Sequence, residues 1–190
     1  MGERLRGGTT VYLLRHAQST VDPALPESDW PLSEAGVLQA DELRARLALL
    51  GIEQVVSSPF VRAVETVRPF CQAAGIELQI DSELRERRLS GRWIRDFEGI
   101  LRKTWEDFDL AVPGGESSRG CQDRVVGCIS RLATAARGQT MVVSSHGNAI
   151  ALFLNALDPA FGWSEWRAMR NPDLFRTSLN GSRWGPVVRL

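Results

Sequence analysis

Lysine is almost absent from this chain, because only Lys103 among its 23 basic residues is a lysine. Schiff-base chemistry and a Walker-type phosphate-binding lysine therefore have almost no candidate residue. The 23 basic residues equal the 23 acidic residues in number, so the formal net charge is zero. A balanced charge gives no overall field that attracts nucleic acid or an anionic membrane. Any preference for an anion must therefore come from a local cluster of residues.

Long hydrophobic runs are absent too. No apolar stretch approaches the length of a membrane span, and the first eight residues lack the hydrophobic stretch of a secretory signal. We therefore expect a cytoplasmic protein with no membrane and no nucleic acid among its partners. The length of 190 residues, with 43% hydrophobic and 24% charged residues, fits a single domain spanning 1–190. Nothing in the sequence indicates an oligomeric state.

Cysteine is scarce, and the three cysteines are an odd number. Cys121 and Cys128 lie seven residues apart on the apolar face of a predicted helix, and Cys71 lies in another predicted helix. A free cysteine packs as a small hydrophobic residue. We therefore expect three buried thiols rather than a disulfide or a set of metal ligands.

Strand and helix patterns alternate along the chain, without an internal repeat or a linker-like stretch. Alternation of this kind predicts a three-layer α/β/α sandwich with a mostly parallel central sheet. We expect Ser58 to cap a helix that Pro59 begins and that Pro69 kinks or ends. The expected strands cover 11–14, 54–57, 77–80 and 140–145, with two edge strands at 173–179 and 186–190; the expected helices cover 34–50, about 59–69, 95–108, about 117–137 and a segment from about 148.

The chain has only two histidines, and each follows a short apolar run. His16 follows the strand pattern Val11 to Leu14, and His146 follows the pattern that ends at Ser145. Parallel strands present their C-terminal ends at one edge of a sheet, where ligands of open α/β proteins bind. Arg15 and Arg62 lie after such strand ends as well, so four cationic or potentially cationic side chains are expected to meet. A phosphate group fits this set best, because a guanidinium group binds two of its oxygens.

Simpler interpretations exist for each of these residues taken singly. An arginine after a strand is usually a solvated loop residue, and a histidine is more often structural than nucleophilic. Two histidines are also compatible with zinc, but neither lies in an HExxH or CxxC arrangement, and closely spaced carboxylate ligands are missing. The joint placement favours an anion site that holds no metal and needs no cofactor.

Six segments in a fixed order resemble the histidine phosphatase superfamily, whose members are also called phosphoglycerate mutase-like proteins. The segment from Arg15 to Ser19 resembles the family's Arg-His-Gly signature, and the segment from Ser145 to Asn148 resembles the one with the second histidine. The other four segments are 29–36, 57–66 with the second arginine, 84–87 with an acid, and 114–117. Together they extend over nearly the whole chain, and their combination is much more specific than any one of them.

The resemblance implies the phosphoglycerate mutase-like fold and a role for each matching residue. His16 is expected to attack phosphorus and form a phosphohistidine, while Arg15, Arg62 and His146 hold the oxygens of the phosphoryl group. Glu86 is expected to protonate the leaving oxygen and later to deprotonate water. Three further residues are assigned to substrate binding by the same resemblance: Gly147, Ser19 and Asp22.

The sequence departs from the family pattern at three places. Ala17 stands in place of the usual glycine, and Asp22 stands where many members have asparagine, which puts a negative charge near the rim of the pocket. The chain between Glu86 and Gly91 is one residue longer than the commonest pattern, so Glu83 is an alternative for the acid.

The resemblance favours a metal-independent phosphatase of the histidine acid phosphatase type that acts on a small phosphorylated metabolite. The chain lacks the long insertion between Arg62 and the acid that mutases of this family tend to have. A phosphoglycerate mutase is the first alternative, and a non-catalytic module that binds a phosphorylated ligand is the second. Arginines and aromatic residues alternate in the segment 84–112, either as a substrate-binding lid or as a solvated basic face over a small aromatic core.

Overall fold

The computed structural model describes residues 7–190 of the chain. Six of the eight N-terminal residues in which we expect no secretory signal lie outside the described residues. The elements run in the order β1 (Thr9–Arg15), η1 (Glu27–Asp29), α1 (Glu34–Ala48), β2 (Gln54–Ser57), α2 (Val61–Ala74), β3 (Leu78–Ile80), η2 (Ser82–Leu84), α3 (Phe97–Glu106), α4 (Ser118–Ala135), β4 (Thr140–Ser145), α5 (Gly147–Leu157), α6 (Trp163–Arg167), β5 (Asp173–Asn180), β6 (Arg183–Trp184) and β7 (Val188–Arg189).

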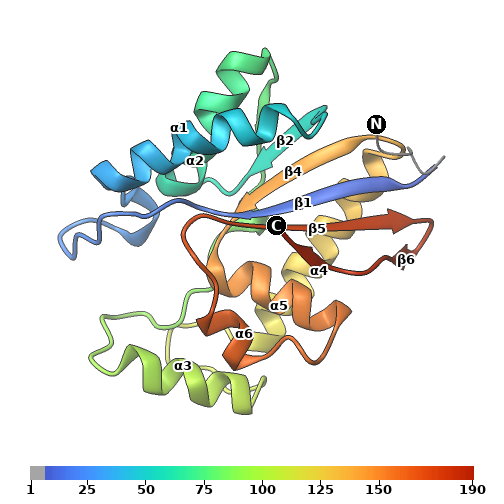
Figure 1. Cartoon of the computed structure of the whole chain (residues 1–190). Coiled ribbons are helices and arrows are strands. Elements are labelled where there is room, and N and C mark those ends of the chain that lie inside the picture. The colour runs from blue at the N-terminus through green and yellow to red at the C-terminus, as the bar shows by residue number, and fades with distance from the viewer. Residues whose placement is uncertain (1–6) are drawn as a thin grey trace.

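A single sheet forms the centre of the molecule, with strand order β3-β2-β4-β1-β5-β6, while β7 also pairs with β5. The strands β3, β2, β4 and β1 are parallel to their neighbours, whereas β5 is antiparallel to β1 and to the two short strands that follow it. Helices α1 and α2 lie above the sheet and α4 and α5 lie below it (Figure 1). The predicted α/β/α architecture is confirmed, but the sheet is mixed rather than mostly parallel, because three of its strand pairings are parallel and three are antiparallel.

The two faces of the sheet follow from the alternation of side chains along each strand. In β1, Val11 and Leu13 pack with the core that contains α4 and α5, whereas Tyr12 and Leu14 pack with the core that contains α1 and α2. Successive strand residues point to opposite faces, so an unbroken apolar run is what a strand buried on both faces requires. This double burial explains why the segments before the two histidines contain no polar alternation.

Two expectations about the start of α2 are wrong, and the helix does not end where the proline permits it. Helix α2 begins at Val61 rather than at Pro59, and its N-cap is Phe60, without a side-chain cap; the Ser58 hydroxyl instead accepts a hydrogen bond from the Phe60 N–H. Pro69 does not end α2, because the helix continues through it to Ala74. Tertiary packing overrides the local cost of the proline, since the neighbouring Phe70 and Cys71 are both buried.

Of the two edge strands expected at the C-terminus, the one at 186–190 contains β7, which pairs with β5 at the edge of the sheet, but the expectation for 173–179 is wrong. Strand β5 pairs along its length with β1 and lies inside the sheet, with the short β6 and β7 on its other side. Gly181, with φ of 62°, forms the turn between β5 and β6. The apolar residues of β5 belong to an interior strand, because antiparallel strands can join a parallel sheet at its side.

The expected burial of the cysteines is confirmed, because Cys71, Cys121 and Cys128 are all buried free thiols. Among residues 7–190, no helix is long and apolar enough to cross a bilayer. The assignment of 1–190 to one domain and the cytoplasmic location stay predictions.

Candidate active site

The C-terminal ends of three neighbouring strands meet at one edge of the sheet. Arg15 at the end of β1 is level with Ser145 at the end of β4, and Ser57 at the end of β2 is level with Ser144. The next residue after each strand continues the pairing, because His16 N–H donates to Ser145 O at 3.0 Å and Ser58 N–H donates to Ser144 O at 2.9 Å. The sheet register therefore brings His16, His146 and the start of α2 to one place.

The four basic side chains expected at this edge do come together. The ring centroids of His16 and His146 are 5.2 Å apart, and the Nε of Arg62 donates to the Nε2 of His16 at 3.2 Å. Arg15 lies within electrostatic range of His16 and His146, because its charge contributes to the lowered pKa of both imidazoles. The structure thus has a compact cationic centre.

His16 is held as a neutral imidazole with a defined tautomer. Its Nδ1 lies 2.7 Å from the carbonyl oxygen of Ala17, which only accepts hydrogen bonds, so the ring proton must be on Nδ1. Its Nε2 then has a free lone pair, and this lone pair accepts the bond from Arg62. The Asn171 side chain donates to the His16 carbonyl at 2.8 Å and anchors the backbone.

The electrostatic surroundings keep the His16 ring uncharged. The side chain is buried, and burial together with the positive charge of Arg62 lowers the pKa of His16 to about 3. The hydrogen bond to Ala17 opposes this shift, and the charge of Arg15 adds to it. A ring with such a pKa has a free lone pair throughout the neutral pH range, as a nucleophile requires.

His146 is completely buried and presents a polar atom without a partner. Its Nε2 is 2.8 Å from the Ser58 hydroxyl oxygen, and this buried hydroxyl has no other acceptor for its proton among residues 7–190, so Ser58 donates to Nε2. That arrangement puts the ring proton of His146 on Nδ1, and Nδ1 has no hydrogen-bond partner among residues 7–190. Burial lowers the pKa of His146 well below its usual value, so the ring is a neutral donor.

Arg15 reaches the site through the space that Gly147 leaves at the start of α5. A Cβ atom on Gly147 would lie 3.2 Å from the Arg15 Cζ and Nε atoms, which is closer than ordinary van der Waals contact. The guanidinium group is fixed by the bond from Nη1 to the Met169 carbonyl at 3.1 Å. Its Nε is buried and has no partner in the part of the chain that the structure describes. Buried donors without partners are costly, so an anion is the natural complement of Arg15 and His146.

Arg62 is bound on every nitrogen of its guanidinium group. Besides the bond to His16, Nη1 donates to the Glu27 carbonyl at 2.6 Å and Nη2 donates to the Glu27 carboxylate at 2.9 Å. The rings of Trp30 and Phe60 lie 5.7 and 5.0 Å from its Cζ atom. Glu27, in the one-turn helix η1, is a residue that sequence reasoning missed, because no motif or spacing distinguishes it from the other acids of its loop.

Glu86 lies at the N-terminus of α5 and is fixed by backbone groups. Its carboxylate accepts from Asn148 N–H at 3.2 Å, from Ala149 N–H at 3.1 Å and from Arg87 N–H at 2.8 Å. Burial lowers the pKa of both Arg15 and Arg62, and the charge of Glu86 opposes that shift in each, so Glu86 lies within electrostatic range of both.

Glu83, the alternative for the acid, points elsewhere. Its carboxylate binds Arg85 at 3.1 Å, and its backbone carbonyl accepts from Arg124 of α4. Of the two candidate acids, Glu86 is therefore the one that the chain brings to the cationic centre.

Ser19 and Asp22 lie in the loop after β1 and shape that loop. Ser19 forms an isolated bridge with Leu32, and the Asp22 side chain accepts from Ala24 N–H at 2.9 Å. The Asp22 carbonyl accepts from the Trp30 indole at 2.8 Å. Neither side chain has a hydrogen bond to the two histidines or the two arginines within residues 7–190. Their assignment to substrate binding stays a prediction.

The segment 84–112 has residues packed in the core and a residue that borders a cavity, and its role as a substrate-binding lid stays a prediction. Arg87 is buried and donates to the hydroxyl groups of Thr104 and Ser118, and Trp105 is buried against Phe108, so these residues are structural. Phe97 is half exposed and borders a cavity of about 240 Å³ that also has Arg15, Trp166 and Asn171 in its wall. This cavity lies directly beside the cationic centre, between α3 and α6.

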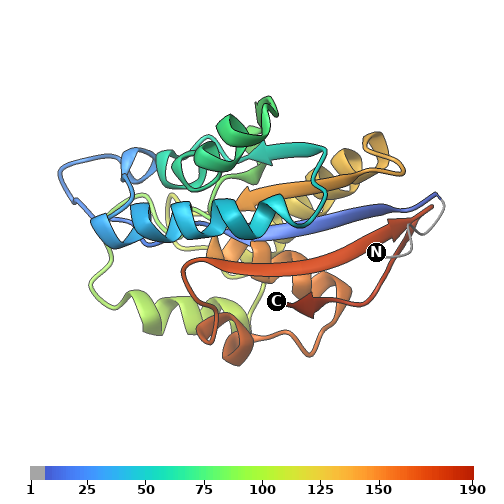
Figure 2. The same ribbon diagram turned by 45° about the horizontal axis from the view of Figure 1, so that its top comes forward.

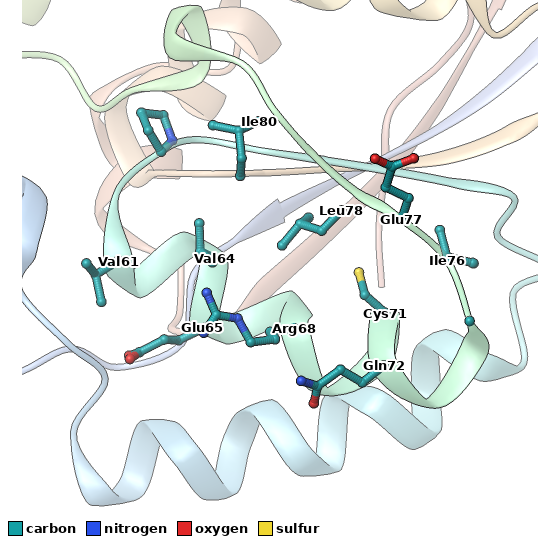
Figure 3. A pocket seen from close by; sticks show the side chains of 12 residues that line it. Val61, Val64, Glu65, Arg68, Cys71, Gln72, Ile76, Glu77, Leu78 and Ile80 are labelled. Atoms are coloured by element: carbon teal, nitrogen blue, oxygen red, sulfur yellow. The ribbon is translucent and has the colours of Figure 1, made fainter.

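A larger open groove lies away from the histidines, on the other side of α2. It has a volume of about 1020 Å³ and runs between α2 and the edge strand β3 (Figure 3). None of the eight predicted site residues lines it. Among residues 7–190 there is also no group of three His, Cys, Asp or Glu side chains placed to hold a metal ion.

Comparison with known proteins adds a family match to this geometry. The model of the histidine phosphatase superfamily (branch 1) matches residues 11–189. The probable phosphoglycerate mutase GpmB of Salmonella paratyphi B is 29% identical over 186 residues, with 92% of this chain and 86% of that protein covered.

Comparison with solved structures shows that the fold is shared with phosphatases. A mycobacterial glucosyl-3-phosphoglycerate phosphatase complexed with VO3 has a TM-score of 0.78 and 27% identity, covering 95% of this chain and 97% of that one. A phosphoserine phosphatase mutant of Entamoeba histolytica, in complex with phosphoserine, has a TM-score of 0.75 over 95% of this chain and 94% of that one; at 18% identity it shows the fold alone. The relatives with a named activity are phosphatases or mutases, which supports a phosphoryl-transfer enzyme.

Proposed function

Because the chain belongs to the histidine phosphatase superfamily, we propose that it is a metal-independent phosphatase that hydrolyses small phosphate monoesters through a phosphohistidine on His16. One observation carries the proposal: the lone pair of the neutral His16 ring lies at a centre where two buried donors, Arg15 Nε and His146 Nδ1, have no partner among residues 7–190. A phosphoryl group satisfies both donors and faces the nucleophile at the same time.

Binding of the phosphate dianion uses the arginines and the second histidine. Arg62 and Arg15 supply positive charge, and the His146 Nδ1–H supplies a further hydrogen bond, so each non-bridging oxygen has a donor. These groups are held rigidly by Glu27, Met169 and Ser58, and their orientation costs nothing at the moment of reaction. In the proposed reaction, guanidinium groups supply the positive charge that stabilises the phosphoryl oxygens in the transition state.

Phosphoryl transfer then takes place in two steps. In the first, the His16 Nε2 lone pair forms a bond to phosphorus while the bond from phosphorus to the ester oxygen breaks, and the Glu86 carboxylic acid gives its proton to that oxygen. In the second, water attacks phosphorus, Glu86 takes a proton from the water, and the bond from phosphorus to Nε2 breaks. The Ala17 carbonyl holds the Nδ1 proton throughout and stabilises the charge on the phosphorylated ring.

A phosphoglycerate mutase is the second candidate, because the relative from Salmonella carries that name. A mutase returns the phosphoryl group from His16 to a second hydroxyl of the substrate instead of giving it to water. The glucosyl-3-phosphoglycerate phosphatase, at similar identity and with 97% of its chain covered, supports hydrolysis instead.

Incubation with 3-phosphoglycerate and a catalytic amount of 2,3-bisphosphoglycerate separates the two candidates. We expect release of inorganic phosphate from a panel of phosphorylated metabolites and from p-nitrophenyl phosphate, unaffected by EDTA. Efficient formation of 2-phosphoglycerate would instead make the protein a mutase. Phosphate binding without turnover of any ester would leave only the non-catalytic module.

A further inference from the structure

Glu27 contacts the same arginine that contacts the nucleophile. Its carbonyl and its carboxylate accept bonds from the two terminal nitrogens of Arg62 at 2.6 and 2.9 Å, while the third nitrogen of Arg62 donates to His16. The Arg62 side chain is 4% exposed, whereas the Glu27 side chain is 43% exposed. Glu27 therefore lies at the border between the buried phosphate site and solvent.

The carboxylate of Glu27 is separated from the nucleophile His16 only by the Arg62 guanidinium group, which contacts both residues. Burial raises the pKa of Glu27, and the charge of Glu86 raises it further, although Arg62 opposes the shift. Glu86 is the acid that reaches the ester oxygen in the proposed reaction. Glu27 is thus in contact with Arg62, within electrostatic range of Glu86, and partly open to solvent, on the side from which an ester must enter the buried phosphate site. The loop that carries Glu27 and the segment before α3 lie at the same end of the sheet, beyond the ends of β1 and β4 (Figure 2).

Arg62 is the positive charge in contact with Glu27, at 2.9 Å, and it offsets the charge of Glu27 before a ligand binds. In the proposed reaction the same guanidinium group also faces the phosphate dianion, so the pair and the bound phosphate together are negative. Arg88 is close enough to lower the pKa of Glu27, but its side chain is exposed and its only polar contact among residues 7–190 is a bond of 3.4 Å to the Ser90 carbonyl. A solvated guanidinium group screens a neighbouring charge weakly.

We propose that Glu27 determines substrate specificity by charge, and that it favours phosphate esters with an ammonium or hydroxyl group next to the phosphate over esters with a carboxylate or a second phosphate there. The inference rests on the proposed function, since it concerns the alcohol part of the same ester. The physical reason is direct: the carboxylate repels a second anionic group and attracts a cationic one at the same position.

Two small esters of opposite charge test the inference. Phosphoethanolamine has an ammonium group and phosphoglycolate has a carboxylate close to the phosphate, so their kcat/KM ratio isolates the effect of charge. We expect the wild-type protein to prefer phosphoethanolamine and Glu27→Gln to reduce that preference by about five- to tenfold, as expected for unit charges a few ångströms apart in a half-exposed site. Any general effect of losing the bond to Arg62 changes both substrates and cancels in the ratio.

Asp29→Asn is the matched control, because Asp29 lies in the same short helix and binds Ser28 rather than Arg62. We expect this variant to keep the wild-type ratio. An unchanged ratio in Glu27→Gln, or an equal change in Asp29→Asn, would overturn the inference. If Glu27→Gln does not fold, the wild-type ratio at low and high salt replaces it: the preference should fall with salt, and a salt-independent ratio would be contrary to the inference.

Failure of the proposed function gives a different result from failure of this inference. If the wild-type protein hydrolyses neither these two esters nor the metabolite panel nor p-nitrophenyl phosphate, the proposed phosphatase activity is wrong, and the dissociation constants of the two esters, measured by calorimetry, take the place of kcat/KM. The same five- to tenfold change in their ratio in Glu27→Gln would then support the role of Glu27 in ligand selection. No change in that ratio would refute it.

Discussion

Replacing Glu86 by glutamine separates proton transfer from the rest of the proposed reaction. The glutamine has nearly the shape of the glutamate, and its oxygen still accepts the bonds from Ala149 and Arg87 N–H. Its NH₂ group, however, faces the Asn148 N–H, which is a donor as well. We expect the variant to lose roughly 1–2 kcal/mol of stability, from this unfavourable pair and from the lost charge at the start of α5, and to remain folded.

The effect on activity depends on the leaving group. A positioned general acid contributes roughly 10²- to 10⁴-fold to a reaction whose leaving group needs a proton, so alkyl phosphates should lose about that much in kcat/KM. p-Nitrophenol leaves as a stable anion and needs little protonation, and its ester should lose less than about tenfold in the step that forms the phosphohistidine. The ratio of the two losses is the diagnostic quantity, because a general disturbance of the site would affect both esters equally.

The assay is a comparison of p-nitrophenyl phosphate and an alkyl phosphate, with the formation of the phosphoenzyme followed in a rapid burst experiment. Glu83→Gln is the matched control, because Glu83 binds Arg85 and not the start of α5. We expect it to leave both rates within about twofold of the wild-type values.

Two results would refute the reasoning about Glu86. Equal losses on the two esters in Glu86→Gln would mean that another residue is the acid. Selective loss of alkyl phosphate hydrolysis in Glu83→Gln, with little change in Glu86→Gln, would mean that the acid is the other candidate and that the solution geometry differs from the one described above.

Further predictions concern the nucleophile, Gly147 and the pH dependence of stability. His16→Ala should abolish the acid-labile phosphoenzyme while the circular dichroism spectrum stays native, and a persistent phosphohistidine signal would assign the nucleophile elsewhere. Gly147→Ala should displace the Arg15 guanidinium group and weaken phosphate binding, measured by calorimetry, about tenfold. Gly127→Ala is the control, because its added Cβ meets nothing within 4 Å, and it should leave phosphate binding unchanged. Equal phosphate affinities of the two variants would contradict the steric argument. In phosphate-free buffer, the free energy of unfolding should fall as the pH drops from 6.5 toward 3, because the unfolded chain protonates His16 in this range and the folded chain does not. The contribution of His16 to the change in the free energy of unfolding approaches about 1.4 kcal/mol per pH unit. His16→Asn should therefore reduce this pH dependence by a comparable amount in urea titrations. An unchanged pH dependence would mean that the pKa of His16 is not lowered in the folded protein.

The sequence predicts those strands and helices whose pattern is set by neighbouring residues in the chain. The apolar runs before His16 and His146 predict buried strands because a strand covered on both faces needs an unbroken series of apolar side chains. The alternation of strands with amphipathic helices then predicts a parallel sheet, and in a parallel sheet the strand ends share an edge. The errors arise where packing outweighs a local preference, as at Pro69, which α2 accommodates, and in β5, which lies inside the sheet.

No local pattern in the sequence predicts the contacts between distant segments. Ser58 meets His146 across 88 residues and Glu27 meets Arg62 across 35, and neither pair is marked by spacing or by a motif. Family resemblance supplied the site segments, but it left the acid open between Glu83 and Glu86. The backbone path into α5 distinguishes the two, because the first turn of this helix offers N–H groups that only Glu86 reaches.

By itself, the order of residues determined the layered architecture and the convergence of two histidines with two arginines, since hydrophobic periodicity and the rules of parallel sheets depend on the chain alone. The family followed from the resemblance of six sequence segments. Only the tertiary structure decided the tautomer of His16, the partners of the arginines and the surroundings of Glu86. Hydrogen bonds and electrostatic shifts act over a few ångströms, and such distances between remote segments exist only after the sheet register and the helix packing are in place.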